Sequence, residues 1–192
     1  MSKDRDADMV ESVVTWTRNR SEQIADCKIF QLRRDYSTSS AGSDEHTFVC
    51  LECPDWVNII PLTADKQVLL IEQYRHGIEG ITLEIPGGMV DGNESPQIAA
   101  VRELLEETGY VPREVIALGK SRPNPAIQNN WVYHFLALDI EFKQEPEFDT
   151  TEHAVIRFVP LEEISLLIQT EAITHSLVVA GFHRLSLWQQ AV

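Results

Sequence analysis

The feature that most constrains this chain is a helix predicted over residues 94–108, with Pro96 marking its start and Gly109 its end. The apolar positions that recur with helical period are Ile98, Val101, Leu104 and Leu105. Pro96 fits the first turn, where its missing N–H costs nothing, and Gly109 fits the position that terminates the helix. Before the helix, Gly87 and Gly88 allow the backbone to approach a ligand closely. The sequence therefore predicts that a strand end, a loop and a helix face converge on one spot.

Three glutamates lie in the C-terminal half of this helix. Glu103 and Glu107 are four residues apart and share a face, where like charges cost about 0.2–0.5 kcal/mol per pair in isolated helices. Glu106 adds a third acid at the end where the helix dipole disfavours anions. A bound divalent cation would reverse this repulsion, and carboxylate oxygens favour Mg²⁺, Mn²⁺ or Ca²⁺ over zinc. The alternative is a solvated acidic face on which Arg102 pairs with Glu106, and only the preceding glycine pair favours the metal site over it.

The whole pattern is Gly88, five residues, Glu94, seven residues, and then the run from Arg102 to Tyr110. It resembles the signature of the Nudix hydrolases, the Nudix box, at every fixed position, with Tyr110 where the family usually has an aliphatic residue. The resemblance covers about residues 50–190. It implies an α/β fold of the α+β type, in which a mixed β-sheet is sandwiched between helices (α/β/α). It also implies hydrolysis of a nucleoside diphosphate linked to another group.

The resemblance assigns roles to residues of the motif. Glu103 and Glu107 are expected to be the main metal ligands, joined by the backbone carbonyl of Gly87. Glu106 is expected to be a further ligand or an acid that orients the attacking water, so that Glu106 and Glu107 take part in catalysis. Mg²⁺ is the expected cofactor, with Mn²⁺ as a substitute, since metals neutralise a diphosphate and activate water. Structural roles in the motif are expected for Gly88, Glu94, Arg102 and Gly109.

A glutamate outside the motif is the candidate general base. Glu152 precedes the last predicted strand, where the resembling enzymes place a catalytic or metal-binding glutamate. His153 is a distant second choice, because a loop histidine is more often simply solvated. Glu106 and Glu84 remain alternatives. The neighbouring acidic loop, which could close over a substrate, contains Glu145, Glu147 and Asp149.

Two segments before the motif bear on the substrate. Residues 71–75 and 83–91 resemble the branch of the family that cleaves ADP-ribose and nucleoside diphosphate sugars. In that branch, Arg75 is expected to contact the substrate phosphates, and Glu84 is expected to assist near the metals. A hairpin ahead of the common core also suits this branch, where such an extension often builds a dimer.

The loop after the motif gives a mixed indication about the substrate. Pro125 lies sixteen residues after Gly109, a spacing associated with ADP-ribose pyrophosphatases. The surrounding sequence RPNPAIQNN lacks the glycine-rich character of those enzymes, which favours another nucleoside diphosphate sugar. The polar side chains that could bind sugar hydroxyls, or could equally cap local turns, are those of Asn124, Asn129 and Asn130.

The pattern of the remaining sequence predicts mainly strands, followed by two helices. The predicted strands are 27–36, 46–52, 56–63, 67–75, 81–88, 114–120, 130–140 and 155–161, and the helices are 161–169 and 175–189. Residues 1–25 are polar and are expected to be partly helical or poorly ordered. We expect residues 1–45 to form an N-terminal segment and antiparallel β-hairpin extension that serves for dimerisation, and residues 46–192 to form the Nudix hydrolase domain.

Composition narrows the partners and the compartment. The formal net charge of −14 disfavours nucleic acids and anionic membranes as partners. No apolar run approaches the roughly 18 residues of a membrane-spanning helix, and no secretory signal opens the chain, so we expect a cytoplasmic protein. Cys50 and Cys53 form a lone C-x-x-C, which with Cys27 cannot supply four zinc ligands, so all three are expected to be ordinary thiols.

Three functions are compatible with these observations. The leading one is Mg²⁺-dependent hydrolysis of ADP-ribose or a nucleoside diphosphate sugar to a nucleoside monophosphate and a sugar phosphate, by a homodimer. The second is pyrophosphohydrolysis of nucleoside triphosphates or dinucleoside polyphosphates. The third is a non-catalytic Nudix domain that senses a nucleotide; such a domain would be expected to lose glutamates of the motif, and this chain retains them all.

Overall fold

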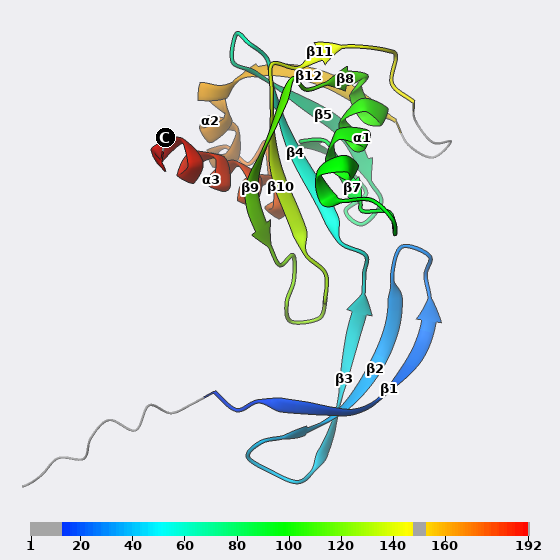
Figure 1. Cartoon of the computed structure of the whole chain (residues 1–192). Coiled ribbons are helices and arrows are strands. Elements are labelled where there is room, and N and C mark those ends of the chain that lie inside the picture. Colours follow the sequence, from blue (N-terminus) through cyan, green and yellow to red (C-terminus); the bar gives the residue numbers. More distant parts are fainter. Residues whose placement is uncertain (1–12, 148–152, 192) are drawn as a thin grey trace, which may run out of the picture. The chain divides into compact units, whose positions relative to one another are not determined.

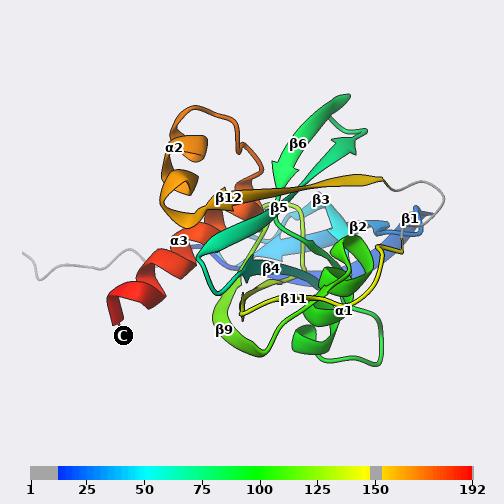
Figure 2. The ribbon, with the colours of Figure 1, turned by 90° about the horizontal axis from the view of Figure 1, so that it is seen from above.

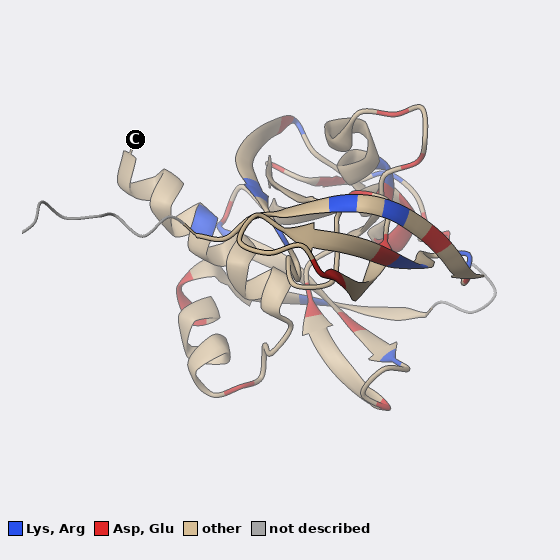
Figure 3. Ribbon diagram, turned by 90° about the horizontal axis from the view of Figure 1, so that it is seen from below, with Lys and Arg blue, Asp and Glu red and all other residues tan. Residues whose placement is uncertain are grey.

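The computed structural model describes residues 13–147 and 153–191. Its contacts separate two units, with the boundary after Glu52 (Figure 1). Within the described ranges, no helix is long and apolar enough to cross a membrane. Acidic residues occur on strands, helices and loops (Figure 3), so the net charge of −14 does not come from one segment.

The N-terminal unit is an antiparallel sheet with the strand order β1-β2-β3. Its strands are β1 (Trp16–Asp26), β2 (Gln31–Ser39) and β3 (Glu45–Glu52). The predicted antiparallel extension is therefore present, and the pairing of β2 with β3 runs from Gln31↔Glu52 to Thr38↔Glu45. This pairing places β3 in the N-terminal unit, whereas the sequence analysis places residues from 46 onward in the hydrolase domain.

β1 is a strand where the sequence analysis expects helix or poorly ordered chain, and that expectation was wrong. Trp16 at its start packs against Phe48 of β3, but most of its other side chains are polar and show no hydrophobic alternation. Cζ of Arg20 lies 3.2 Å from the centre of the Tyr36 ring, and the Tyr36 hydroxyl donates to Glu22 at 3.1 Å. Cross-strand pairs of this kind stabilise a strand without an apolar pattern in the sequence.

The C-terminal unit is built on a mixed sheet with the order β12-β5-β4-β10-β9, extended by β6 beside β5 and β7 beside β4. The strands are β4 (Trp56–Leu62), β5 (Gln67–Arg75), β6 (Gly80–Glu84), β7 (Gly87–Met89), β9 (Glu114–Ser121), β10 (Val132–Leu138) and β12 (Ala154–Pro160). β4 and β10 are parallel, and the other neighbours are antiparallel. A separate antiparallel pair joins β8 (Tyr110–Val111) to β11 (Glu141–Phe142).

Helices cover both faces of this sheet (Figure 1, Figure 2). They are α1 (Pro96–Thr108), the 3-10 helix η1 (Leu161–Glu163), α2 (Ile164–Gln169) and α3 (Ser176–Ala191). Val57 and Ile59 of β4 pack in one apolar cluster with Leu104 of α1. Ile60, on the opposite face of β4, packs in a second cluster with Phe182 of α3. The predicted α/β/α arrangement is confirmed, and the alternation along β4 explains how one strand serves two helical layers.

The ends of α1 follow from local chemistry. Ser95 adopts an extended conformation and its hydroxyl accepts the N–H of Ile98 at 3.3 Å, so the helix begins at Pro96 rather than at Glu94. At the other end Gly109 has φ of 79° and its N–H donates to the Leu105 carbonyl at 2.8 Å. The predicted terminating role of Gly109 is confirmed, because the left-handed conformation favours glycine.

A buried histidine in β10 makes stability depend on pH. His134 is 1% exposed, its Nε2 lies 2.8 Å from Ser121 Oγ, and burial together with the nearby charge of Arg184 lowers its pKa to about 4. Between this value and the ordinary histidine pKa of about 6.5, the unfolded chain binds more protons, so protonation favours unfolding. We expect the free energy of unfolding to fall by roughly 2 kcal/mol between pH 7 and pH 5 through this residue.

Urea unfolding across this pH range tests the expectation. His134→Gln should flatten the pH dependence, while His183→Gln, at an exposed position of α3, should leave it unchanged. Equal slopes for the wild type and His134→Gln would assign the pH dependence to other groups.

Candidate active site

The predicted convergence of the glycine pair with the acidic helix face is present. The N–H of Gly87 in β7 donates to Glu107 Oε2 at 3.0 Å. A Cβ added at Gly88 would overlap with the carboxylate of Glu103. The strand therefore touches α1 through the two glutamates that were predicted to be the main metal ligands, and only glycine permits this approach.

Glu107 is the most constrained acid of the site. It is 8% exposed, and its Oε1 accepts a hydrogen bond from Gln73 Nε2 at 2.9 Å. Burial raises the pKa of Glu107 to about 8, and the negative charge of Glu103 adds to the shift, while the hydrogen bonds from Gln73 and Gly87 oppose it. With this pKa, Glu107 is largely protonated and neutral at pH 7, and it would regain its negative charge beside a bound cation.

Arg102 holds the other acids of the motif. Its guanidinium lies 2.7 Å from Glu94 Oε1, 3.0 Å from Glu103 Oε1 and 2.9 Å from Glu106 Oε2. It also donates to the Met89 carbonyl at 3.0 Å. The hydrogen bond to Glu94, with the neighbouring charges, raises the pKa of Arg102 above its ordinary value. The Arg102–Glu106 pair of the solvated-face interpretation is thus present, within a larger cluster that ties α1 to the segment before it.

The donor set fits a hard divalent cation. Glu103, Glu106 and Glu107 supply carboxylate oxygens, and the buried Glu107 with its raised pKa is a position where positive charge is favoured. As placed, the described residues hold no group of three His, Cys, Asp or Glu side chains close enough to bind a metal. Since Glu103 and Glu106 point to Arg102, these two carboxylates would have to turn from the guanidinium toward a cation.

This arrangement predicts an effect of Arg102 on stability that depends on metal. Arg102→Met leaves three acids without their shared cation, so we expect the free energy of unfolding to fall by about 1–2 kcal/mol in EDTA. Millimolar Mg²⁺ should restore part of the loss. Thermal unfolding with and without Mg²⁺ measures this, and Arg113→Met, which removes an exposed pair with Glu141, is the control. A loss in Tm that Mg²⁺ does not reduce would contradict the expectation.

A second charged group lies beside β7. Glu84 is 3% exposed and accepts from Arg75 Nε and Nη2, each at 2.8 Å, and from Thr82 Oγ1 at 2.5 Å. Burial alone would raise the pKa of Glu84, but the hydrogen bonds from Arg75 and Thr82 lower it below the ordinary value. A carboxylate with a lowered pKa and three donors is poorly suited to accept a proton from water, which weighs against Glu84 as the general base.

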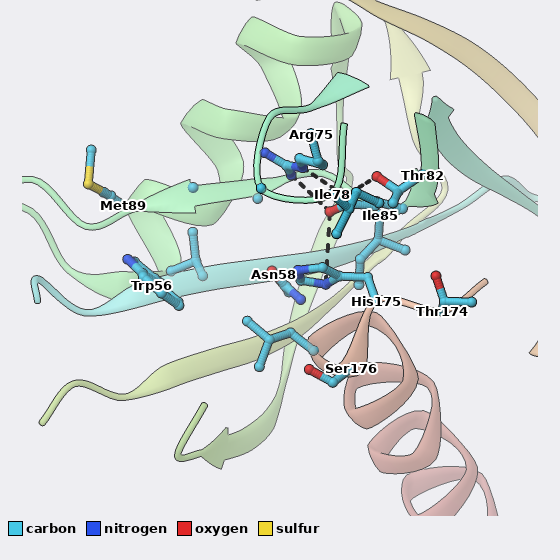
Figure 4. Close-up of a pocket in the computed structure, with 16 residues that line it drawn as sticks. Trp56, Asn58, Arg75, Ile78, Thr82, Ile85, Met89, Thr174, His175 and Ser176 are labelled. Carbon is cyan, nitrogen blue, oxygen red and sulfur yellow. Dashed lines mark hydrogen bonds and ion pairs between the residues drawn. The ribbon is translucent and has the colours of Figure 1, made fainter. Parts of the chain in front are cut away.

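A pocket of about 610 Å³ opens between this pair and the start of α3 (Figure 4). Its lining includes four of the residues singled out by the sequence analysis, namely Arg75, Glu84, Gly87 and Gly88. Asn124, Pro125 and Asn129 do not line it. Asn129 Oδ1 instead accepts the N–H of Cys53 at 3.0 Å, which is a long-range contact. In the turn that begins at Asn124, the backbone carbonyl of Asn124 accepts two N–H groups.

The structure describes only part of the acidic segment. Glu152 and Asp149 lie outside the described residues. The N–H of Glu147 donates to the Glu106 carbonyl at 2.8 Å, which fixes this part of the acidic segment beside the end of α1.

The site also contains residues that were not predicted from the sequence. One is Gln73, although its alternation with Arg75 along β5 could have indicated it. Others are the residues from the start of α3 that line the pocket, for which no pattern exists.

Comparisons with known proteins find relatives in sequence and in fold. The chain is 28% identical to the ADP-ribose pyrophosphatase of Bacillus subtilis over 121 residues, which are 62% of this chain and 65% of that protein. It is 26% identical to the methanol dehydrogenase activator of Bacillus methanolicus over 169 residues, 88% of this chain and 91% of that protein. The crystal structure of an ADP compounds hydrolase shares the fold, with a TM-score of 0.83 at 23% identity, over 94% of this chain and 97% of that chain.

The decisive match is the family model of the NUDIX domain, which covers residues 54–181. This segment contains the glycine pair, all of α1 and the strands of the mixed sheet. It is well over half of the chain, and it includes the contacts through which β7 and α1 bring the acids together. The chain therefore belongs to the Nudix family and is a hydrolase.

Proposed function

We propose that this hydrolase uses Mg²⁺, for which Mn²⁺ can substitute, to cleave the diphosphate bond of ADP-ribose or a nucleoside diphosphate sugar. The products are a nucleoside monophosphate and a sugar phosphate. The observation that carries the proposal is the hydrogen bond from Gly87 to the buried Glu107, since Gly87 also lines the 610 Å³ pocket. The acids of α1 and a cavity of the size typical for small-molecule ligands are thereby neighbours.

The residues divide the work as follows. Glu103, Glu106 and Glu107, with the Gly87 carbonyl, would hold the cation. When bound, the cation supplies neutralisation of the diphosphate and activation of a water molecule. Arg75, held in the pocket wall by Glu84, is the proposed contact to the phosphates. Glu152 is retained as the proposed general base, with Glu106 as the alternative.

A substrate panel tests the proposal. The protein is incubated with Mg²⁺ and ADP-ribose, ADP-glucose, UDP-glucose, GDP-mannose, diadenosine polyphosphates or dGTP, and nucleotide products are quantified by chromatography. We expect turnover of at least one nucleotide sugar and loss of that turnover in EDTA. Turnover of dGTP or diadenosine polyphosphates alone would favour the pyrophosphohydrolase alternative, and turnover of no compound would favour a nucleotide-sensing domain.

We also propose that the N-terminal unit serves for dimerisation in a cytoplasmic enzyme. Its sheet has two edge strands, β1 and β3, and it exposes large apolar side chains that a partner could cover. These side chains are Val13, Val14, Trp16, Ile24, Ile29, Phe48 and Val49. Light scattering on the full chain should give the mass of two copies, and a monomer mass at micromolar concentration would contradict this part of the proposal.

A further inference from the structure

Gln73 is a side chain of β5 that reaches an acid of α1. Ile71, two residues earlier on the strand, packs in the apolar cluster that contains Leu104 of α1. Alternation along a strand puts Gln73 on the same face as Ile71. From this face, Nε2 of Gln73 donates to Oε1 of Glu107 at 2.9 Å. β5 therefore contacts, through a neutral amide, one of the acids that are expected to bind the cation.

Two donors divide the oxygens of Glu107 between them. Oε1 accepts the amide of Gln73, and Oε2 accepts the N–H of Gly87 in β7 at 3.0 Å. Turning the carboxylate about its last bond would break both hydrogen bonds, so its plane is fixed from two strands. An ionised carboxylate has about four acceptor positions, so each oxygen keeps one for a further partner. The acceptor positions that remain on Glu107 thus point in fixed directions.

The other two acids of α1 are held by a charged partner. Glu103 and Glu106 lie 3.0 Å and 2.9 Å from the guanidinium of Arg102. A guanidinium competes with a metal ion for the negative charge of a carboxylate, whereas the N–H groups of Gln73 and Gly87 carry no net charge. Glu107 is therefore the acid that can bind a cation where it stands, without first leaving a salt bridge.

The backbone of Gln73 is held on both sides. Gln73 pairs with Ala154 of β12 and with Thr82 of β6, and the Thr82 hydroxyl donates to the Gln73 carbonyl at 3.4 Å. A residue that is paired with two neighbouring strands cannot shift without breaking the hydrogen bonds of both pairings. The amide thus projects from a rigid position, as the orientation of a metal ligand requires.

Fixed directions matter most for a small cation. Mg²⁺ demands near-ideal octahedral geometry at about 2.0–2.1 Å, whereas Ca²⁺ accepts about six to eight oxygens in flexible arrangements at about 2.3–2.6 Å. Loss of a partner that orients a metal ligand typically lowers metal affinity by about 10–100-fold. An amide that orients Glu107 should therefore stabilise the binding of Mg²⁺ more than the binding of Ca²⁺.

We propose that Gln73 is a positioning residue: its amide holds the carboxylate of Glu107 in the orientation that Mg²⁺ requires and thereby makes the site selective for Mg²⁺ over Ca²⁺. The inference rests on the proposed function, because it takes Glu107 as a ligand of the cation, and deepens it by naming the side chain that selects among hard cations. Gln73 acts only through Glu107, and the pocket of about 610 Å³ is lined by other residues of the described chain.

The test measures cation affinity without substrate. Gln73→Met keeps the length of the side chain, removes the donor and adds no charge. Gln67→Met makes the same replacement on the same strand, where the hydrogen bonds of Gln67 to Thr63 come from backbone atoms of Gln67. Thermal unfolding of the metal-free protein and at increasing concentrations of Mg²⁺ or Ca²⁺ gives the two dissociation constants.

The expected result is a change in selectivity. The dissociation constant for Mg²⁺ should rise on the order of 10-fold in Gln73→Met, while that for Ca²⁺ stays within about threefold of the wild type. Gln67→Met should match the wild type for both cations. In turnover, the Mg²⁺ concentration that gives the half-maximal rate should rise by the same factor in Gln73→Met, with KM for the nucleotide sugar unchanged at saturating Mg²⁺.

A second variant separates positioning from packing. Gln73→Asn keeps the amide but is one methylene shorter, so it cannot reach Glu107 and should show the same change in selectivity. Both variants should keep a metal-free Tm within a few degrees of the wild type, because each loses one hydrogen bond. If Gln73→Met does not fold, the comparison of Gln73→Asn with the wild type decides.

Two results would overturn the inference. One is a normal dissociation constant for Mg²⁺ in both variants. The other is an equal rise for Mg²⁺ and Ca²⁺, which would mean that Gln73 supports the fold of the site without selecting the cation. The proposed function fails separately: if the wild type binds Mg²⁺ but hydrolyses no nucleotide sugar, the affinities still decide the role of Gln73. Equal Mg²⁺ binding by the wild type and Glu107→Gln would refute both the ligand set and the role of Gln73.

Discussion

Replacing Glu107 with glutamine is expected to lower kcat/KM on the order of 100-fold or more, while the protein remains folded. Glutamine keeps the shape of the side chain but removes the negative charge that a cation needs. In the metal-free protein the change should be mild, because burial already raises the pKa of Glu107 to about 8 and the acid is largely neutral at pH 7. Glutamine has one acceptor oxygen and keeps only one of the hydrogen bonds from Gln73 and Gly87. The free energy of unfolding should therefore fall by about 1 kcal/mol.

Two measurements separate loss of metal binding from loss of fold. Mg²⁺ should raise the Tm of the wild type and should no longer raise that of Glu107→Gln, whose Tm in EDTA stays within a few degrees of the wild type. Glu163→Gln, at an exposed position of η1, controls for removing a negative charge from this acidic chain and should keep both activity and the Mg²⁺ response. Near-normal turnover by Glu107→Gln would show that the cation is held elsewhere.

Replacing Gly109 with alanine is expected to lower the thermal stability of the protein much more than adding a methyl group at the exposed Gly92. Gly109 has φ of 79°, and a left-handed conformation costs an L-residue roughly 1–2 kcal/mol. The added Cβ would also overlap with the Gln144 carbonyl. The N–H groups of Lys143 and Gln144 donate to the Gly109 carbonyl, so this segment cannot move away without losing those hydrogen bonds. Together these effects should lower Tm by roughly 5–12 °C in a chain of this length.

Calorimetry on the metal-free protein provides the measurement. Gly92→Ala is the matched control, because a Cβ at Gly92 meets no atom within 4 Å. Its Tm should stay within about 2 °C of the wild type, since the replacement only adds a methyl group in open space. Similar Tm shifts for Gly92→Ala and Gly109→Ala would show that the backbone conformation and close contact at Gly109 do not destabilise the alanine variant.

The sequence predicted those parts of the molecule whose causes are local. Pro96 and Gly109 mark the ends of α1 because their backbone preferences act within one helical turn. Glu103 and Glu107 share a face because of the helical repeat alone. β1 could not be predicted in this way, since it is stabilised by polar partners on β2 rather than by its own hydropathy pattern.

Contacts between segments that the motif does not link could not be predicted. The pocket combines Asn58 with His175, more than a hundred residues apart, and the sequence contains no spacing that relates them. Such pairs are set by the order of strands in the sheet and not by the properties of either residue.

The parallel pairing of β4 with β10 has a consequence for how the enzyme matures. The pair joins Trp56 to Val132 and Leu62 to Leu138, so the partners are 76 positions apart in the sequence, and all of β7 and α1 lies between them. Closing so long a loop is slow compared with forming a helix or a hairpin. Because the acids of α1 and the pocket both depend on this central pairing, a chain that has formed the helix but not this pair has the glutamates without a usable site. Catalytic activity should thus appear only after this pairing has formed, and its recovery during refolding reports completion of the sheet rather than formation of the helix.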